Sequence, residues 1–87
     1  MTLNFPNGNR SFDASRDLIR FWGYDSALEI SFFVTVDALE KLNSQTRKSE
    51  EGYLETFDAV RNRIHKSARK VYSRGGKFVY FLEAADF

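Results

Sequence analysis

The sequence contains no cysteine and only one histidine, His65. The lack of cysteine excludes a disulfide framework, a thiol nucleophile and every cysteine-ligated metal site. A single imidazole cannot supply the paired histidines of the common zinc sites, so we expect no metal and no cofactor. The chain also lacks any apolar run near the roughly twenty residues that span a membrane, so we expect no membrane partner.

Proline and glycine are scarce, with one and five copies among 87 residues. Hydrophobic residues make up 43% of the chain and aromatic residues 16%, which is enough for a core and excludes a disordered chain. The length allows one domain, residues 1–87. Because the polar first ten residues do not look like a signal peptide, we expect a cytoplasmic protein.

Short apolar runs separated by turn residues predict the strands of a sheet. A turn at Pro6-Asn7-Gly8 follows a short extended start at Leu3–Phe5. The composition then predicts four strands: Arg10–Asp13, Leu18–Tyr24, Ala27–Val34 and Lys77–Leu82. In the predicted strand Ala27–Val34, apolar residues at every second position share one face: Leu28, Ile30, Phe32 and Val34. The last strand is apolar at five consecutive positions, which predicts burial on both faces.

Two helices are predicted between the last two strands. Thr35 is an N-cap candidate for a short helix over Val36–Leu42, and Ser49 is one for a long helix over Glu50–Ser73. An apolar stripe at three- and four-residue spacing runs along the long helix, which Gly75-Gly76 ends as a left-handed cap. The order strand-strand-strand-helix-helix-strand predicts an α+β domain with an antiparallel sheet of about four strands and both helices on one face.

Four blocks follow one another along the chain: Arg20-Phe21-Trp22-Gly23-Tyr24-Asp25, Ser31-Phe32-Phe33-Val34, Ala38-Leu39-Glu40-Lys41-Leu42 and the closing Ala85-Asp86-Phe87. In these blocks the sequence resembles the domain-of-unknown-function 1488 family of small bacterial proteins. The resemblance covers nearly the whole chain and implies a small α+β fold in a bacterial cytoplasm. It implies no activity, so no functional residue is carried over from it.

The far face of the predicted hairpin carries large side chains that two helices on the other face cannot cover. They are Leu18, Arg20, Trp22 and Tyr24, joined by Phe33 from the neighbouring strand, and the predicted partner-binding residues among them are Arg20, Trp22, Tyr24 and Phe33. Exposed aromatic surface of this kind marks interfaces, and Trp, Tyr and Arg are the residue types that dominate binding energy. We therefore expect a non-enzymatic interaction protein that forms a homodimer through this face. The alternative is that the N-terminal segment, with Leu3 and Phe5, folds back over these side chains, or that the sheet bends and buries both of its sides.

A second candidate surface is basic. Seven basic residues and no acid lie between Arg61 and Lys77, and subtracting these seven charges from the total of +1 leaves −6 on the rest. The predicted nucleic-acid-binding residues are Arg63, Lys66, Arg69, Lys70 and Arg74. Ordinary helix electrostatics offers another explanation, because acids early in the predicted long helix and bases late in it suit the helix dipole.

No catalytic constellation is evident in the sequence. His65 lies on the flank of the predicted apolar stripe, where a histidine is usually packed, and Asp58 is seven residues away along the same predicted helix. No Gly-x-Ser-x-Gly motif supplies a nucleophile, and no glycine-rich loop opens a helix to hold phosphate. We therefore expect no enzymatic activity.

Overall fold

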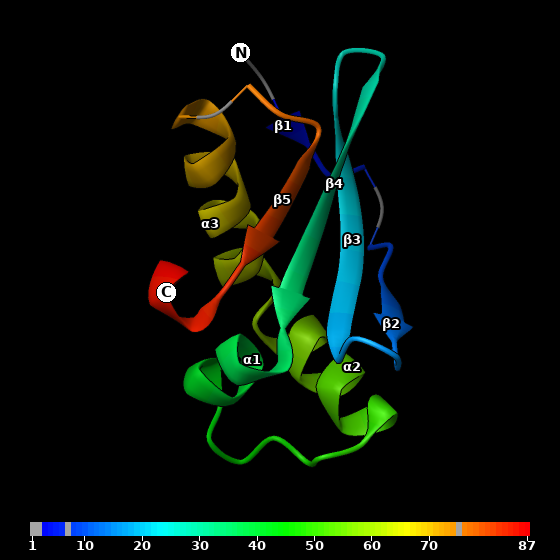
Figure 1. Ribbon diagram of the computed structural model, residues 1–87, viewed down its shortest axis with the longest axis vertical. Helices are drawn as coiled ribbons and strands as arrows, with labels where there is room; N and C mark the ends of the chain where they lie inside the picture. The colour runs from blue at the N-terminus through cyan, green and yellow to red at the C-terminus, as the bar shows by residue number, and fades with distance from the viewer. Residues whose placement is uncertain (1–2, 7, 75) are drawn as a thin grey trace.

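The computed structural model describes residues 3–6, 8–74 and 76–87 and folds them as a sheet with helices on one side (Figure 1). Asn7 of the predicted turn and Gly75 of the predicted cap lie outside the described residues. The strands are β1 (Leu3–Asn4), β2 (Ser11–Asp13), β3 (Leu18–Asp25), β4 (Leu28–Thr35) and β5 (Val79–Leu82). The helices are α1 (Val36–Leu42), α2 (Glu50–Ala59), α3 (Arg61–Arg74) and the short 3-10 helix η1 (Ala84–Asp86).

The sheet is built around the long antiparallel hairpin of β3 and β4. Its register runs from Leu18 opposite Thr35 to Asp25 opposite Leu28. The short strands β1 and β2 both pair antiparallel with the other edge of β3, one near each of its ends. β5 pairs with the free edge of β4, so the main order is β1-β3-β4-β5.

The predicted α+β class is confirmed, and the sheet is mostly antiparallel. One detail differs from the prediction, because β5 runs parallel to β4. The chain leaves β4 through three helices and crosses back along one side of the sheet before β5 begins (Figure 1). A crossover of this length is the connection that parallel neighbours require.

The predicted long helix is in fact two helices, α2 and α3, which meet at Val60. Val60 has φ −112° and ψ 18°, which is not helical, although its N–H still donates to Thr56 O at 3.0 Å. The apolar stripe continues across the break, since Phe57 and Ile64 are both fully buried. Because neither glycine nor proline marks the junction, the sequence pattern carries no signal for the change of direction.

Both predicted N-caps are confirmed. Thr35 Oγ1 accepts from the N–H of Ala38 at 3.1 Å, and Ser49 Oγ accepts from the N–H of Gly52 at 3.1 Å. The left-handed cap predicted at Gly75-Gly76 includes Gly75, so it lies outside the described residues.

The core lies between the inner face of the sheet and the helices. The largest fully buried side chains come from β3, β4, β5 and all three α-helices: Phe21, Phe32, Phe57, Ile19, Ile30, Leu39, Ile64, Leu82 and Val34. Stacked or tilted rings run through it, with Phe21 5.2 Å from Phe32 and Phe32 5.5 Å from Tyr80 between ring centroids. In Figure 1 α3 lies beside and partly behind β5, and α2 lies at the lower end of β3.

Two burial predictions are wrong. β5 is buried on one face only, because it is an edge strand: Tyr80 and Leu82 point into the core, while Val79 and Phe81 are about half exposed. Leu28, predicted to share the buried face of its strand, is 52% exposed, because it lies at the tip of the hairpin, which projects at the top of Figure 1.

Candidate interaction surfaces

We call the side of the sheet turned away from α2 and α3 the outer face. The strand register sets its side chains in rows, of which two are Arg20–Phe33–Phe81 and Trp22–Ser31–Val79. A third row pairs Tyr24 with Glu29. The predicted partner-binding residues therefore share one face, as expected: Arg20, Trp22, Tyr24 and Phe33. All four are half-buried rather than fully exposed.

Trp22 is partly covered by its own neighbours. The guanidinium carbon of Arg20 lies 4.5 Å from the centroid of the Trp22 ring. The same guanidinium donates to Glu29 Oε2 at 3.1 Å and to Ser31 Oγ at 3.0 Å. The Tyr24 hydroxyl donates to the other oxygen of Glu29 at 3.4 Å. This network fixes Arg20 over the indole, so the most open apolar surface lies elsewhere on the outer face.

That open surface lies on β5, which contains none of the predicted partner-binding residues. Val79 is 47% exposed and Phe81 is 51% exposed. Phe81 stacks on Phe33 with centroids 5.1 Å apart, and Arg16 lies 5.0 Å from the Phe33 centroid. Strand alternation places Val79 and Phe81 on the side opposite Tyr80 and Leu82. Because all four residues are apolar, the sequence does not show that one of these sides is exposed.

The N-terminal segment does not cover the outer face. Phe5 packs on the helix side, where its ring lies 3.9 Å from His65 and 5.8 Å from Phe21 between centroids. Leu3 is buried in the same layer. The alternative explanation, in which Leu3 and Phe5 shield the Trp22 side of the sheet, is therefore wrong.

The predicted basic residues do not form one surface. Arg63, Lys66 and Lys70 are exposed on one stripe of α3, and with Ser67 they line a hollow of about 270 Å³ whose other wall is Asp86 and Phe87. Arg69 lies apart: its Nε donates to Leu3 O at 3.2 Å and its guanidinium lies 5.0 Å from the Phe5 centroid. Arg74 ends α3, and its side chain is outside the described part of the chain.

His65 is packed against Phe5, as its position on the flank of the apolar stripe predicts. Burial, together with the positive charges of Arg69 and Arg61, lowers the pKa of His65 from 6.5 to about 4. Asp58 is bound instead by Arg10, whose Nε donates to its Oδ1 at 2.9 Å, and by Arg61. The hydrogen bond from Arg10 is the largest cause of the lowered pKa of Asp58.

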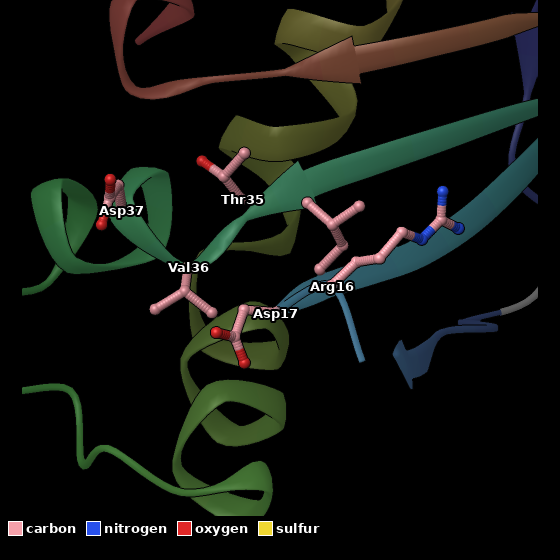
Figure 2. Close-up of a pocket in the computed structure, with 6 residues that line it drawn as sticks. Arg16, Asp17, Thr35, Val36 and Asp37 are labelled. Carbon is pink, nitrogen blue, oxygen red and sulfur yellow. The ribbon is translucent and has the colours of Figure 1, made fainter. Parts of the chain in front are cut away.

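Another hollow, of about 310 Å³, lies where β3 begins and α1 starts (Figure 2). Two acids line it, but Figure 2 shows that Asp17 and Asp37 point in different directions. Arg16 extends away from both in Figure 2, and its guanidinium carbon lies 5.0 Å from the Phe33 centroid. Within residues 3–6, 8–74 and 76–87, no group of three or more His, Asp or Glu side chains is placed to hold a metal ion. No helix in the described part of the chain has the length and apolar character to cross a membrane.

The fold and these surfaces define a small α+β protein with two candidate binding regions. Residues 3–80 match the family described as protein of unknown function (DUF1488), and the chain belongs to that family. A crystal structure of a DUF1488 protein of unknown function from Shewanella loihica PV-4 is similar, with a TM-score of 0.81, 18% identity and 94% of each chain covered. At this identity the likeness shows the fold alone. Among curated proteins, none matches the chain.

Proposed function

We propose that the protein is a small, non-enzymatic interaction protein that forms a homodimer through its outer face, with Phe81 near the centre of the contact. The observation that carries this proposal is the row Arg20–Phe33–Phe81, which ends in a half-exposed aromatic ring on an edge strand. Large aromatic groups in such positions supply most of the energy of protein interfaces.

The strand β5 adds a second reason. Within the described residues it pairs only with β4, so its other edge presents unpaired backbone groups. Natural sheets protect such edges with charges, proline or a covering element. The strand Val79–Leu82 has neither charge nor proline. A partner that covers β5 would remove this exposed edge and bury Val79 and Phe81 together.

The mixture of charges on the outer face favours a second copy of the chain as the partner that covers β5. A two-fold symmetric interface uses the same patch on both subunits, so the patch must be complementary to itself. The outer face meets this condition, because it carries the positive charge of Arg16 and Arg20 as well as the negative charge of Glu29. A strongly charged partner would instead favour a face of one sign.

The test is the mass in solution, measured by sedimentation equilibrium from low to high micromolar concentration. The wild type is expected to approach twice the 10.1 kDa of one chain. Phe81→Lys should weaken dimer formation at least about tenfold, because a truncated or charged hot-spot residue typically costs 2 kcal/mol or more. Trp22→Ala should have a smaller effect, since Arg20 already covers the indole.

Leu28→Lys is the matched control. Leu28 is as exposed as Phe81 and lies on the same sheet, but at the hairpin tip and away from the rows of the outer face. It should leave dimer formation unchanged. A wild type that stays monomeric at all concentrations, or equal weakening by the two lysine substitutions, would refute the proposal.

A further inference from the structure

Most basic side chains of this protein have a partner within the fold. Six form ion pairs with carboxylates: Arg10, Arg16, Arg20, Arg47, Lys48 and Arg61. Lys41 donates to two carbonyl oxygens and Arg69 to one. Among the basic side chains that the structure describes, four have no ion-pair or hydrogen-bond partner. Three of these four, Arg63, Lys66 and Lys70, line the same hollow beside α3.

The break at Val60 removes the ordinary explanation for these charges. In one continuous helix they would lie in the later turns, where the dipole favours cations. In the actual structure α3 begins at Arg61 and has no acid in its first turn, so Arg63 lies where the dipole disfavours a cation. Lys66 and Lys70 are four residues apart, a spacing at which like charges repel. These three charges therefore repel one another when no anion is bound.

The opposite wall of the hollow is held in place. Lys41 Nζ donates to Ala84 O at 3.0 Å and to Phe87 O at 2.6 Å, which fixes the C-terminal segment beside α3 (Figure 1). The wall contains one acid, Asp86, whose Oδ2 already accepts from the N–H of Glu83 at 2.7 Å. Among the side chains that line the hollow, three cations thus face one carboxylate, which is already engaged.

We propose that this hollow binds a small phosphorylated ligand through Arg63, Lys66 and Lys70. Lysine and arginine are the residues that proteins use to bind phosphate, and the hydroxyl of Ser67 adds a donor on the same stripe of α3. A volume of about 270 Å³ lies just below the range of pockets for drug-sized ligands, so it suits one or two phosphate groups with a small substituent.

A nucleic acid is less well matched to this geometry. A nucleic-acid strand is bound by a row of basic side chains that follows several successive phosphates. Here Arg69 is turned to the other flank of α3 and is bound to Leu3 O, so the cations are confined to one hollow.

The experiment titrates the ¹⁵N-labelled protein with pyrophosphate at constant ionic strength and follows the backbone amides. Saturable shifts are expected at Arg63–Lys70 and at Asp86 and Phe87. The variant Lys66→Gln with Lys70→Gln should weaken binding about tenfold or more, since each charge-assisted hydrogen bond contributes on that scale. The double variant Lys66→Arg with Lys70→Arg should retain pyrophosphate binding. Glutamine keeps helix propensity near that of lysine, and far-UV circular dichroism verifies the fold.

The matched control is Arg47→Gln with Lys48→Gln. It removes the same charge from exposed residues of the loop before α2, outside the hollow. Equal weakening in both double variants would mean general attraction by net charge and would overturn the proposal, as would a lack of shifts at millimolar pyrophosphate. A parallel titration with a single-stranded oligonucleotide separates the alternatives. Tighter binding of the oligonucleotide, with shifts that extend to Arg69 and Lys77, would assign the cluster to nucleic acid instead.

Discussion

Phe5 lies flat against His65, with ring centroids 3.9 Å apart and planes 6° apart. This contact joins the N-terminal segment to the middle of α3, residues that are sixty positions apart in the sequence. The guanidinium of Arg69 also lies over the Phe5 ring, 5.0 Å from its centroid. The imidazole is thus partly buried against an apolar ring, and the positive charges of Arg69 and Arg61 act on it; burial and these charges disfavour its protonation.

The first prediction concerns pH. The pKa of His65 is lowered from 6.5 to about 4 in the folded protein, so the unfolded chain takes up the proton more readily. Above pH 6.5 His65 is neutral in both the folded and the unfolded protein, so the stability that its low folded pKa provides is fully present. As the pH falls from 6.5 toward 4, the free energy of unfolding should decrease. With allowance for solvent screening of a half-buried group, the decrease is on the order of 1–2 kcal/mol.

Urea unfolding followed by Trp22 fluorescence at several pH values measures this decrease. The variant His65→Gln cannot titrate, so its free energy of unfolding should change less over the same interval. An NMR titration that places the imidazole pKa of the folded wild type near 6.5, or equal pH dependence in wild type and variant, would contradict the assignment.

The sequence was sufficient to predict most of the local structure. Thr35 and Ser49 are recognisable because an N-cap is a short-range interaction, set by a side chain and an amide three residues later. The hairpin of β3 and β4 is likewise evident from alternation along a strand. The outer face followed from that alternation, so Arg20, Trp22, Tyr24 and Phe33 were correctly placed together.

Three features of the structure depend on long-range contacts that no local sequence pattern encodes. The position of β5 at an edge, and hence the exposure of Phe81, is decided by which strand it pairs with after a crossover through three helices. The break at Val60 accompanies the pairing of Asp58 with Arg10, 48 positions earlier. The hollow beside α3 requires the C-terminal segment, which Lys41 holds in place. Each of these relationships joins residues far apart in the chain.

A second prediction concerns Gly52 in the first turn of α2. A Cβ at this position would lie 2.1 Å from the carbonyl oxygen of Arg47, which is backbone and cannot move aside easily. Gly52→Ala should therefore lower the free energy of unfolding by roughly 1–3 kcal/mol, although alanine is the better helix former. Gly76→Ala is the control, because its Cβ would meet nothing within 4 Å, and it should be neutral or slightly stabilising. A thermal melt distinguishes the two, and a stabilised Gly52→Ala would refute the argument.

A third prediction concerns Asp58, which accepts two hydrogen bonds of 2.9 Å from Arg10 and is also bound by Arg61. Asp58→Asn should lower the free energy of unfolding by about 1 kcal/mol at low salt, near the upper end for partly exposed pairs. The loss should shrink as salt is added, because screening weakens the wild-type pair.

Glu55→Gln is the comparison for Asp58→Asn. Its partner Arg47 is 58% exposed and Glu55 itself is 66% exposed, so little should change. Chemical unfolding of both variants at low and high salt tests the difference. Equal, salt-independent losses would show that the Asp58 network contributes no more than an ordinary surface pair.

The last prediction compares two phenylalanines with opposite environments. Phe57 of α2 is fully buried, and its ring centroid lies 5.3 Å from that of Phe21, whereas Phe78 just before β5 is 58% exposed. Phe57→Ala should lower the free energy of unfolding by about 3–5 kcal/mol, because it removes a buried ring and leaves a cavity beneath α2. That is a large part of the roughly 4–13 kcal/mol expected for a domain of this size, so the variant should be partly unfolded at physiological temperature. Phe78→Ala should change the free energy of unfolding by less than about 0.5 kcal/mol. Urea denaturation measures both, and a loss of comparable size at Phe78 would mean that the segment before β5 is packed in solution rather than exposed.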